Sequence, residues 1–249
     1  MDRACSPLVQ ALHPSPNFEP RRGKPRADML VLHYTGMMSA ARAIAWLAEP
    51  VSRVSCHYVI DEAGCITQMV AESQRAWHAG VGSWAGETDI NSASIGIEIQ
   101  NPGHDLGYPD FGETQMAAVI ALSQDIIARN RIPATRVLAH SDVSPGRKID
   151  PGEKFEWARL HAAGVGHWVA PTPVDVSEFG FGAGDCAPLI GQTTALLAQY
   201  GYGVTPSDTL DARGATVVRS FQLHFRPERP DGRVDRSTLA TLEALLAAV

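Results

Sequence analysis

The chain has 249 residues, of which 45% are hydrophobic and 19% are charged, and its formal net charge is −6 at pH 7. A chain of this length can bury a sizeable core, either as two domains or as one large α/β domain. With this acidic net charge, the composition gives no sign of the positively charged surface that binds nucleic acid or an anionic membrane. No apolar run approaches the roughly 20 residues of a membrane-spanning helix.

The N-terminal residues 1–27 are rich in proline, arginine and polar side chains, and we expect an irregular lead-in there. They contain no apolar segment typical of a secretory signal, and a lipidated Cys5 would need such a segment before it. The four cysteines show no CxxC spacing and no evident pairing. These features favour a cytoplasmic protein. The alternative is a periplasmic or envelope protein, if a signal segment precedes this sequence in the native gene product.

Strands and helices alternate over residues 28–166. The predicted strands are 29–34, 56–60, 65–70, 94–100 and 136–140, of which 56–60 and 65–70 form a hairpin. Ser39 as N-cap and Pro50 after the end bound a helix over 39–48, and helically spaced apolar residues predict another over 114–129. This alternation predicts an α/β fold with a mixed central sheet flanked by helices.

The pattern changes after residue 166. Residues 167–186 contain prolines and a glycine-rich run, which is the composition of a linker. Beyond them the periodicity is purely helical, with expected helices over 189–200, 212–225 and 236–248. We therefore expect a separate small three-helix domain over 187–249.

Three residues have the composition of a catalytic metal site. His33 and His140 each end an apolar run, and Asp150 closes the polar stretch that follows His140. Rigid scaffolds usually present catalytic groups at strand ends and in the loops after them. Two imidazoles and one carboxylate, with a fourth position left open, are typical ligands of catalytic zinc. The pattern alone does not bring the three together in space.

Glu98 and Lys148 are candidates for proton transfer and charge stabilisation. Alternation along the strand puts Ile97 and Ile99 on one face and Glu98 on the other. Glu98 is then either a solvent-facing acid or a general base whose charged form is disfavoured beside an apolar wall. Lys148 lies two residues before Asp150. It is either a solvated lysine or a cation placed to stabilise an oxyanion.

Five segments together carry a family resemblance. They are Val-Leu-His-Tyr-Thr at 31–35, Ser-Cys-His-Tyr-Val-Ile-Asp at 55–61, Ala-Trp-His-Ala-Gly at 76–80, Ser-Ala-Ser-Ile-Gly-Ile-Glu-Ile at 92–99, and Ala-His-Ser-Asp at 139–142 running to Arg-Lys-Ile-Asp-Pro-Gly at 147–152. In this order they resemble the zinc N-acetylmuramoyl-L-alanine amidases of the type 2 class. That family shares its fold with peptidoglycan recognition proteins and phage amidase-lysozymes.

The resemblance implies a role for each candidate in the catalytic machinery. It makes His33, His140 and Asp150 the ligands of Zn²⁺. It makes Glu98 the catalytic acid and base, and Lys148 the residue that stabilises the transition state. The predicted catalytic domain covers residues 28–166.

The resemblance also suggests residues that contact substrate. It implies substrate binding for His78 and Tyr34, while two interpretations of Trp84 are open: an aromatic wall of the cleft, or packing at the surface. His57, in a predicted strand, is expected to be structural. The remaining histidines have no neighbour in the sequence at the spacing of a metal ligand or catalytic partner, and we expect them at the surface. They are His13, His104, His161, His167 and His224.

The C-terminal segment resembles a small peptidoglycan-binding domain. Phe221, Gln222 and the pattern Gly232-x-x-Asp235-x-x-Thr238 carry this match. The helical spacing of Phe221 makes it a core residue first, so a wall-binding function rests on the resemblance alone.

The expected function is a zinc hydrolase acting in cell-wall recycling or turnover. It would cleave the amide bond between N-acetylmuramic acid, or its 1,6-anhydro form, and L-alanine of the peptidoglycan stem peptide. The expected partners are muropeptides and anhydro-muropeptides, with polymeric peptidoglycan a further possibility. Two alternatives are open: a muropeptide-binding protein without catalysis, and a zinc peptidase that cuts within the stem peptide.

Overall fold

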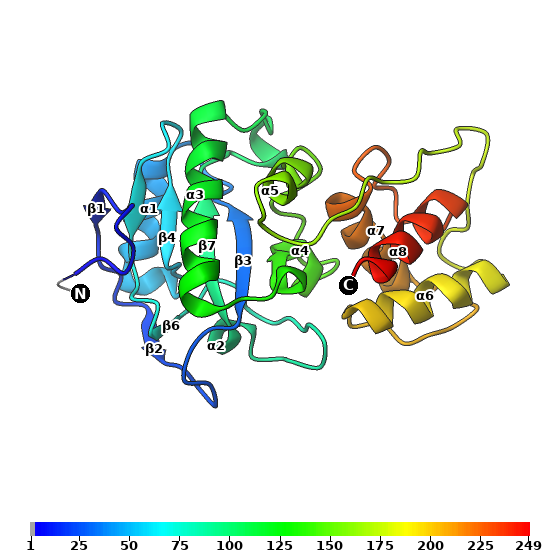
Figure 1. Ribbon diagram of the computed structural model, residues 1–249, viewed down its shortest axis with the longest axis horizontal. Helices are drawn as coiled ribbons and strands as arrows, with labels where there is room; N and C mark the ends of the chain where they lie inside the picture. The colour runs from blue at the N-terminus through cyan, green and yellow to red at the C-terminus, as the bar shows by residue number, and fades with distance from the viewer. Residues whose placement is uncertain (1–2) are drawn as a thin grey trace.

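A six-stranded mixed sheet organises the N-terminal part of the computed structural model, which describes residues 3–249 (Figure 1). The strand order is β1 (Ala11–Leu12), β5 (Ile66–Gln68), β4 (Tyr58–Ile60), β7 (Ser94–Ile99), β3 (Met29–Tyr34) and β8 (Val137–Ala139). The pairs β4–β7, β7–β3 and β3–β8 are parallel, whereas β4 and β5 form an antiparallel hairpin. The predicted mixed sheet is confirmed.

One face of this sheet is apolar and is covered by a long helix. Helix α3 (Glu113–Asn130) lies across β7 in Figure 1. The side chains of Leu30 and Leu32 on β3 and of Ile95, Ile97 and Ile99 on β7 belong to the buried cluster that α3 completes. Since side chains alternate along a strand, the residues between them must face the other way.

The opposite face carries the polar groups. The parallel register between β3 and β7 pairs Met29 with Ser94, Val31 with Gly96, and His33 with Glu98. The alternation predicted for Glu98 therefore puts it beside His33, near the carboxyl ends of the two strands.

Short helices and turns connect the strands. They are α1 (Ala40–Ala48), α2 (Ile90–Ala93), α4 (His140–Val143), α5 (Trp157–Ala162) and the 3₁₀ turns Pro50–Ser52, His104–Leu106 and Ala134–Arg136. The Ser39 hydroxyl accepts a hydrogen bond from the Arg42 N–H at 3.4 Å, so the predicted N-cap is present. All four cysteines are free.

The N-terminal segment contains more order than its composition suggested. In addition to β1, strand β2 (Phe18–Pro20) pairs antiparallel with β6 (Gln74–Ala76). Arg21 is half-buried and donates to the backbone carbonyls of Glu72, Asn91, Ser92 and Ser94. These bonds join the segment to the strand that carries Glu98. The first two residues of the expected lead-in lie outside the described residues.

Three helices follow the sheet region: α6 (Pro188–Tyr200), α7 (Ala212–Phe225) and α8 (Arg236–Ala247). They match the helices expected from the periodicity to within a residue. Figure 1 shows the segment after α5 running along these helices to their far end before α6 begins. None of the helices described for residues 3–249 combines the length and apolar character needed to cross a bilayer.

The three helices pack directly on the polar-face side of the sheet region. One buried cluster joins residues of both parts: Met29, Val31, Trp84, Leu138 and Val143 from the sheet region, and Tyr200, Tyr202, Val217, Phe221 and Phe225 from the helical region. The two parts thus share a hydrophobic core, and Phe221 is a core residue as its spacing predicted.

A buried carboxylate also links the two parts. Asp142 Oδ2 accepts from the Ala139 N–H at 2.8 Å and from His224 Nδ1 at 2.6 Å, and Oδ1 accepts from the Tyr202 hydroxyl at 2.6 Å. The His224 ring stacks on Trp157 with 3.7 Å between ring centroids. The expectation that His224 lies at the surface was wrong, because its partner Asp142 is 82 positions away in the sequence.

His167 also departs from its expected surface position. It is largely buried, and its Nδ1 lies 2.8 Å from the Tyr200 hydroxyl. As with His224, the partner lies in a distant part of the sequence, so no local spacing could reveal it.

Candidate active site

The three predicted ligands meet at the carboxyl ends of neighbouring parallel strands. His33 lies in β3, His140 opens α4 directly after β8, and Asp150 follows in the next loop. The two Nδ1 atoms are 2.8 Å apart, and Asp150 Oδ2 lies 2.9 Å from His140 Nδ1 and 3.2 Å from His33 Nδ1. All three side chains are buried. The strand order therefore brings together residues separated by up to 117 positions.

The protonation of this group favours a cation between the three atoms. His140 Nε2 lies 3.0 Å from the Ala79 carbonyl oxygen, which can only accept, so this contact selects the tautomer with its proton on Nε2 and leaves Nδ1 as the atom that can bind a metal. Burial, followed by the proximity of His140, lowers the pKa of His33 to about 4. Burial opposes ionisation of Asp150, but the two imidazoles hold the pKa of that carboxyl below its usual range. Neutral imidazoles and an ionised carboxylate are the donor set of a metal site.

Glu98 lies next to this cluster without a partner of its own. Among residues 3–249 its Oε2 is shielded from solvent and has no hydrogen-bond partner. Burial, reinforced by the charge of Asp150 and partly offset by Lys148, raises the pKa of Glu98 well above its usual value. A carboxyl in this state can hold and release a proton near neutral pH.

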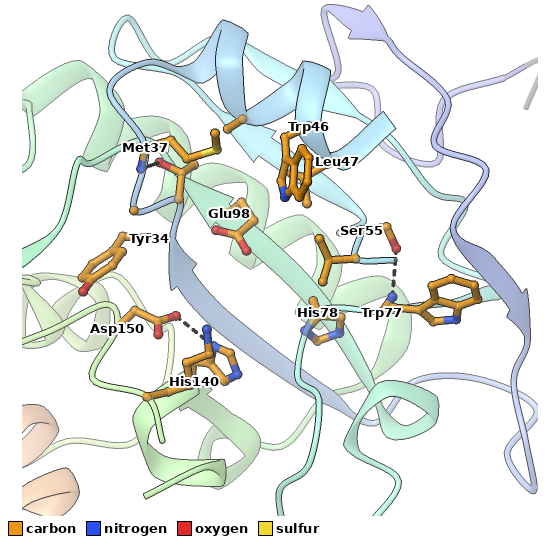
Figure 2. Close-up of a pocket in the computed structure, with 15 residues that line it drawn as sticks. Tyr34, Met37, Trp46, Leu47, Ser55, Trp77, His78, Glu98, His140 and Asp150 are labelled. Atoms are coloured by element: carbon orange, nitrogen blue, oxygen red, sulfur yellow. Dashed lines mark hydrogen bonds and ion pairs between the residues drawn. The ribbon is translucent and has the colours of Figure 1, made fainter. Parts of the chain in front are cut away.

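A cavity of about 390 Å³ opens in front of these groups. Figure 2 shows Glu98 between the α1 side chains on one side and His140 and Asp150 on the other. Its lining residues are Tyr34, Thr35, Gly36, Met37, Ala43, Trp46, Leu47, Val54, Ser55, Trp77, His78, Glu98, His140, Lys148 and Asp150. Lys148 therefore shares the cavity with Glu98, as the oxyanion interpretation requires.

Of the three residues suggested for substrate contact, two line the cavity. Tyr34 and His78 do so, and the Tyr34 hydroxyl lies 3.1 Å from His104 Nδ1. Trp84 does not reach the cavity: it is buried between the two parts of the molecule, with ring centroids 4.8 Å from Tyr202. Its interpretation as a cleft wall is corrected to packing in the shared core, since a bulky aromatic side chain is best buried where two elements meet.

His57 and His78 lie on the same polar face of the sheet. His57 is buried and its Nδ1 accepts from the Gly96 N–H at 3.0 Å, which fits the expected structural role. The His78 ring lies directly over Gly96, where an added Cβ would come within 2.5 Å of the ring. Gly96 is thus required for the His78 ring to occupy this position.

The α1 wall of the cavity was not among the sites selected from the sequence. Ala43, Trp46 and Leu47 line it, and Trp46 is 47% exposed. Their i, i+3, i+4 spacing marks one helix face, which the pattern could have signalled. Which side of the helix would face a cavity depends on its packing over β4, and no local pattern encodes that.

Comparison with known families identifies both parts of the chain. Residues 23–153 match the N-acetylmuramoyl-L-alanine amidase family, and residues 188–242 match a peptidoglycan binding domain family. The first match contains all five candidate catalytic and ligand residues. The second spans α6, α7 and most of α8.

Individual relatives agree with this division. The chain is 38% identical over 238 residues to N-acetylmuramoyl-L-alanine amidase AmiD of Escherichia coli K12, covering 89% of this chain and 83% of that protein. It is 35% identical over 166 residues to 1,6-anhydro-N-acetylmuramyl-L-alanine amidase AmpD of Citrobacter freundii, covering 60% of this chain and 87% of that protein.

Two solved structures resemble the whole chain. One is E. coli AmiD in complex with the substrate anhydro-N-acetylmuramic acid-L-Ala-D-gamma-Glu-L-Lys, with a TM-score of 0.76, 35% identity and 92% of each chain covered. The other is AmpDh3 of Pseudomonas aeruginosa in complex with anhydromuramic pentapeptide, with a TM-score of 0.73, 32% identity, and 91% of this chain and 93% of that chain covered.

Proposed function

The chain belongs to the N-acetylmuramoyl-L-alanine amidase family, and we propose that it works with a zinc ion held by His33, His140 and Asp150. It is an enzyme that cleaves the amide bond between N-acetylmuramic acid, or its anhydro form, and L-alanine. The observation that carries the zinc assignment is the meeting of two imidazole nitrogens and a carboxylate oxygen at the buried end of an open cavity. Three protein ligands leave a coordination position free for chemistry.

Glu98 and Lys148 complete the proposed machinery. When bound, zinc supplies a Lewis acid that polarises the scissile carbonyl and makes water more acidic. Glu98 takes the proton of the water as the water oxygen bonds to the carbonyl carbon. The same carboxyl then gives that proton to the alanine nitrogen as the carbon–nitrogen bond breaks, which yields a lactyl carboxylic acid and a free amine. The acid then loses the second water proton to solvent. Lys148 faces the cavity beside Asp150 and stabilises the oxyanion.

We propose that the cavity accepts an anhydro-muropeptide. Its volume of about 390 Å³ is within the range of small-ligand pockets, and its lining is apolar along α1 and polar at the ligand cluster. This division suits a substrate whose sugar lies against Trp46 and whose amide lies at Glu98. The complexes of AmiD and AmpDh3 with anhydromuramyl peptides support this substrate class.

A single product assay tests the function. The zinc-loaded protein is incubated with a defined anhydro-muropeptide, and the products are identified by mass. We expect anhydro-N-acetylmuramic acid and an intact peptide that begins with L-alanine. Cleavage between stem residues would instead make the protein a peptidase, and binding without products would make it a muropeptide-binding protein.

Metal analysis tests the proposed ligands. We expect about one zinc ion per chain. Full activity in metal-free protein would overturn the zinc assignment.

A further inference from the structure

A chain of hydrogen bonds leads from the backbone of α2 to one of the proposed ligands. The Ser94 hydroxyl donates to the Ile90 carbonyl oxygen at 2.6 Å, and its oxygen lies 3.1 Å from His78 Nε2. His78 Nδ1 in turn lies 2.9 Å from His33 Nε2. Ser94, His78 and His33 are buried, so water does not compete for these contacts.

The direction of each bond follows from the atom at the start of the chain. A carbonyl oxygen can only accept, so the single Ser94 proton goes to Ile90. The Ser94 oxygen must then accept, and the proton facing it belongs to His78 Nε2. Two N–H groups would repel across the 2.9 Å between the rings, so a neutral His78 leaves Nδ1 bare and accepts the Nε2 proton of His33.

We propose that Ser94 and His78 are positioning residues that hold the ring proton of His33 on Nε2 and thereby keep His33 Nδ1 free to bind the metal. The inference rests on the proposed metal site. It adds the side chains that select the tautomer of one ligand, since an imidazole with its proton on Nδ1 cannot bind a cation through that atom.

The two ligand histidines are therefore supported in different ways. His140 is held by the backbone carbonyl of Ala79, which no side-chain substitution removes. His33 depends on two side chains in series. The register of the strands explains why these side chains are available. Ser94, Gly96 and Glu98 lie on the same face of the sheet as His33, and Gly96 leaves space for the His78 ring.

This arrangement also limits what His78 does in the cavity. Both of its ring nitrogens have protein partners, so the ring offers substrate only its carbon edge. We call the hydrogen-bonded series Ser94, His78 and His33 the Ser94 relay. Loss of Ser94 from this relay should weaken metal binding and leave the KM of the zinc-saturated enzyme near the wild-type value. If His78 instead bound substrate through a ring nitrogen, its loss would raise KM and leave metal affinity unchanged.

The first test measures zinc affinity by competition with a chromogenic chelator. Loss of a hydrogen-bond partner behind a metal ligand typically weakens metal binding about 10–100-fold, and we expect Ser94→Ala to fall in this range. Ser123→Ala is the matched control, because Ser123 is equally buried in α3 and its hydroxyl has no hydrogen-bond partner among residues 3–249. Equal affinity in Ser94→Ala and wild type would overturn the proposal.

The second test needs no variant and no metal. Nitrogen-15 NMR of the metal-free wild-type chain distinguishes protonated from bare imidazole nitrogens. We expect protons on Nε2 of both His33 and His78. A proton on His33 Nδ1 would overturn the inference even if the protein binds zinc, whereas failure to bind zinc with the expected tautomers would overturn only the proposed function.

Discussion

Two buried carboxylates follow His140 in the chain, and they have opposite surroundings. Asp142 lies at the contact between the sheet region and the helices, where a backbone N–H, a tyrosine hydroxyl and a histidine each donate to it. Asp150 lies at the cavity, where its Oδ2 faces the Nδ1 atoms of His140 at 2.9 Å and of His33 at 3.2 Å. At Asp142 each carboxylate oxygen has a donor, whereas at Asp150 two imidazole nitrogens and a carboxylate oxygen converge on one point. The first arrangement stabilises the fold, and the second is suited to holding a metal ion.

The same face of the sheet supports both carboxylates. At the carboxyl ends of the strands it presents Glu98 to the cavity and His33 to the ligand cluster behind it. Towards the other end it presents Met29, Val31 and Leu138, which are buried against the three helices. The helices thus cover the part of this face that chemistry does not use, and their loss would expose it.

The comparison predicts its largest effect at Asp150. Asp150→Ala removes a proposed zinc ligand and the only charge in the ligand set. Because a catalytic metal contributes several kcal/mol to the transition state, we expect kcat/KM to fall by about 10³-fold or more. Zinc content and kcat/KM measured on the same preparation check this. Normal zinc content in Asp150→Ala would place the ligand elsewhere.

Glu98→Gln should separate chemistry from metal binding. It keeps the size of the side chain and removes its proton acceptor, so we expect kcat to fall about 10²–10⁴-fold while zinc content stays normal. An unchanged kcat would show that Glu98 takes no part in proton transfer.

The raised pKa of Glu98 adds a prediction about stability. The folded state binds this proton more tightly than the unfolded state, so stability is lost as pH rises from the unfolded pKa towards the folded one. Glu98→Gln removes this loss. Metal-free Glu98→Gln should therefore resist denaturant better than the metal-free wild type at neutral pH, and the advantage should disappear below the unfolded pKa, about pH 4.

At the other carboxylate the comparison predicts a loss of stability. His224→Ala removes a partner of buried Asp142, which typically costs about 3–5 kcal/mol in the free energy of unfolding. Denaturant titration measures this cost. His161→Ala is the control, because that histidine is exposed in α5. Zinc-saturated, folded His224→Ala should keep a kcat near wild type, and a large loss of kcat would show that the helical region also shapes the metal site.

A smaller change tests the same carboxylate. Tyr202→Phe removes one hydroxyl that donates to Asp142, and hydrogen bonds to charged groups contribute about 1.5–3 kcal/mol. Tyr200→Phe is the matched control, because the Tyr200 hydroxyl lies against His167 Nδ1 and not against a carboxylate. This variant should lose less free energy of unfolding than Tyr202→Phe. Equal losses in both variants would mean that the charge of Asp142 adds nothing to the contact.

The sequence predicted the elements and the ligand set but not the contacts between the two parts. The helices, the strand alternation around Glu98 and the positions of His33 and His140 at strand ends follow from local periodicity. Asp142 and His224 are 82 positions apart, and each looks like a surface residue on its own helix. The Ser94 relay was missed for the same reason, since it depends on which strand pairs with β7 and on the space above Gly96.

Two tryptophans extend the comparison between the cavity and the shared core to substrate binding. Trp46 is 47% exposed at the cavity, whereas Trp84 is 2% exposed in the shared core. We expect Trp46→Ala to raise KM about fivefold, or roughly 1 kcal/mol, with little change in kcat or stability, because an aromatic face at the cavity binds substrate and transition state alike.

Trp84→Ala should do the reverse, with a loss of about 3–5 kcal/mol in stability and a KM near wild type once the protein is folded and loaded with zinc. Steady-state kinetics on a defined anhydro-muropeptide, with denaturant titration of the same preparations, check both variants. A second control, Val51→Ala, alters a residue that is 75% exposed close to α1 but outside the cavity lining, and should change neither quantity. An unchanged KM in Trp46→Ala would place the sugar on another wall of the cavity, since the apolar surface of α1 would then contribute nothing to binding.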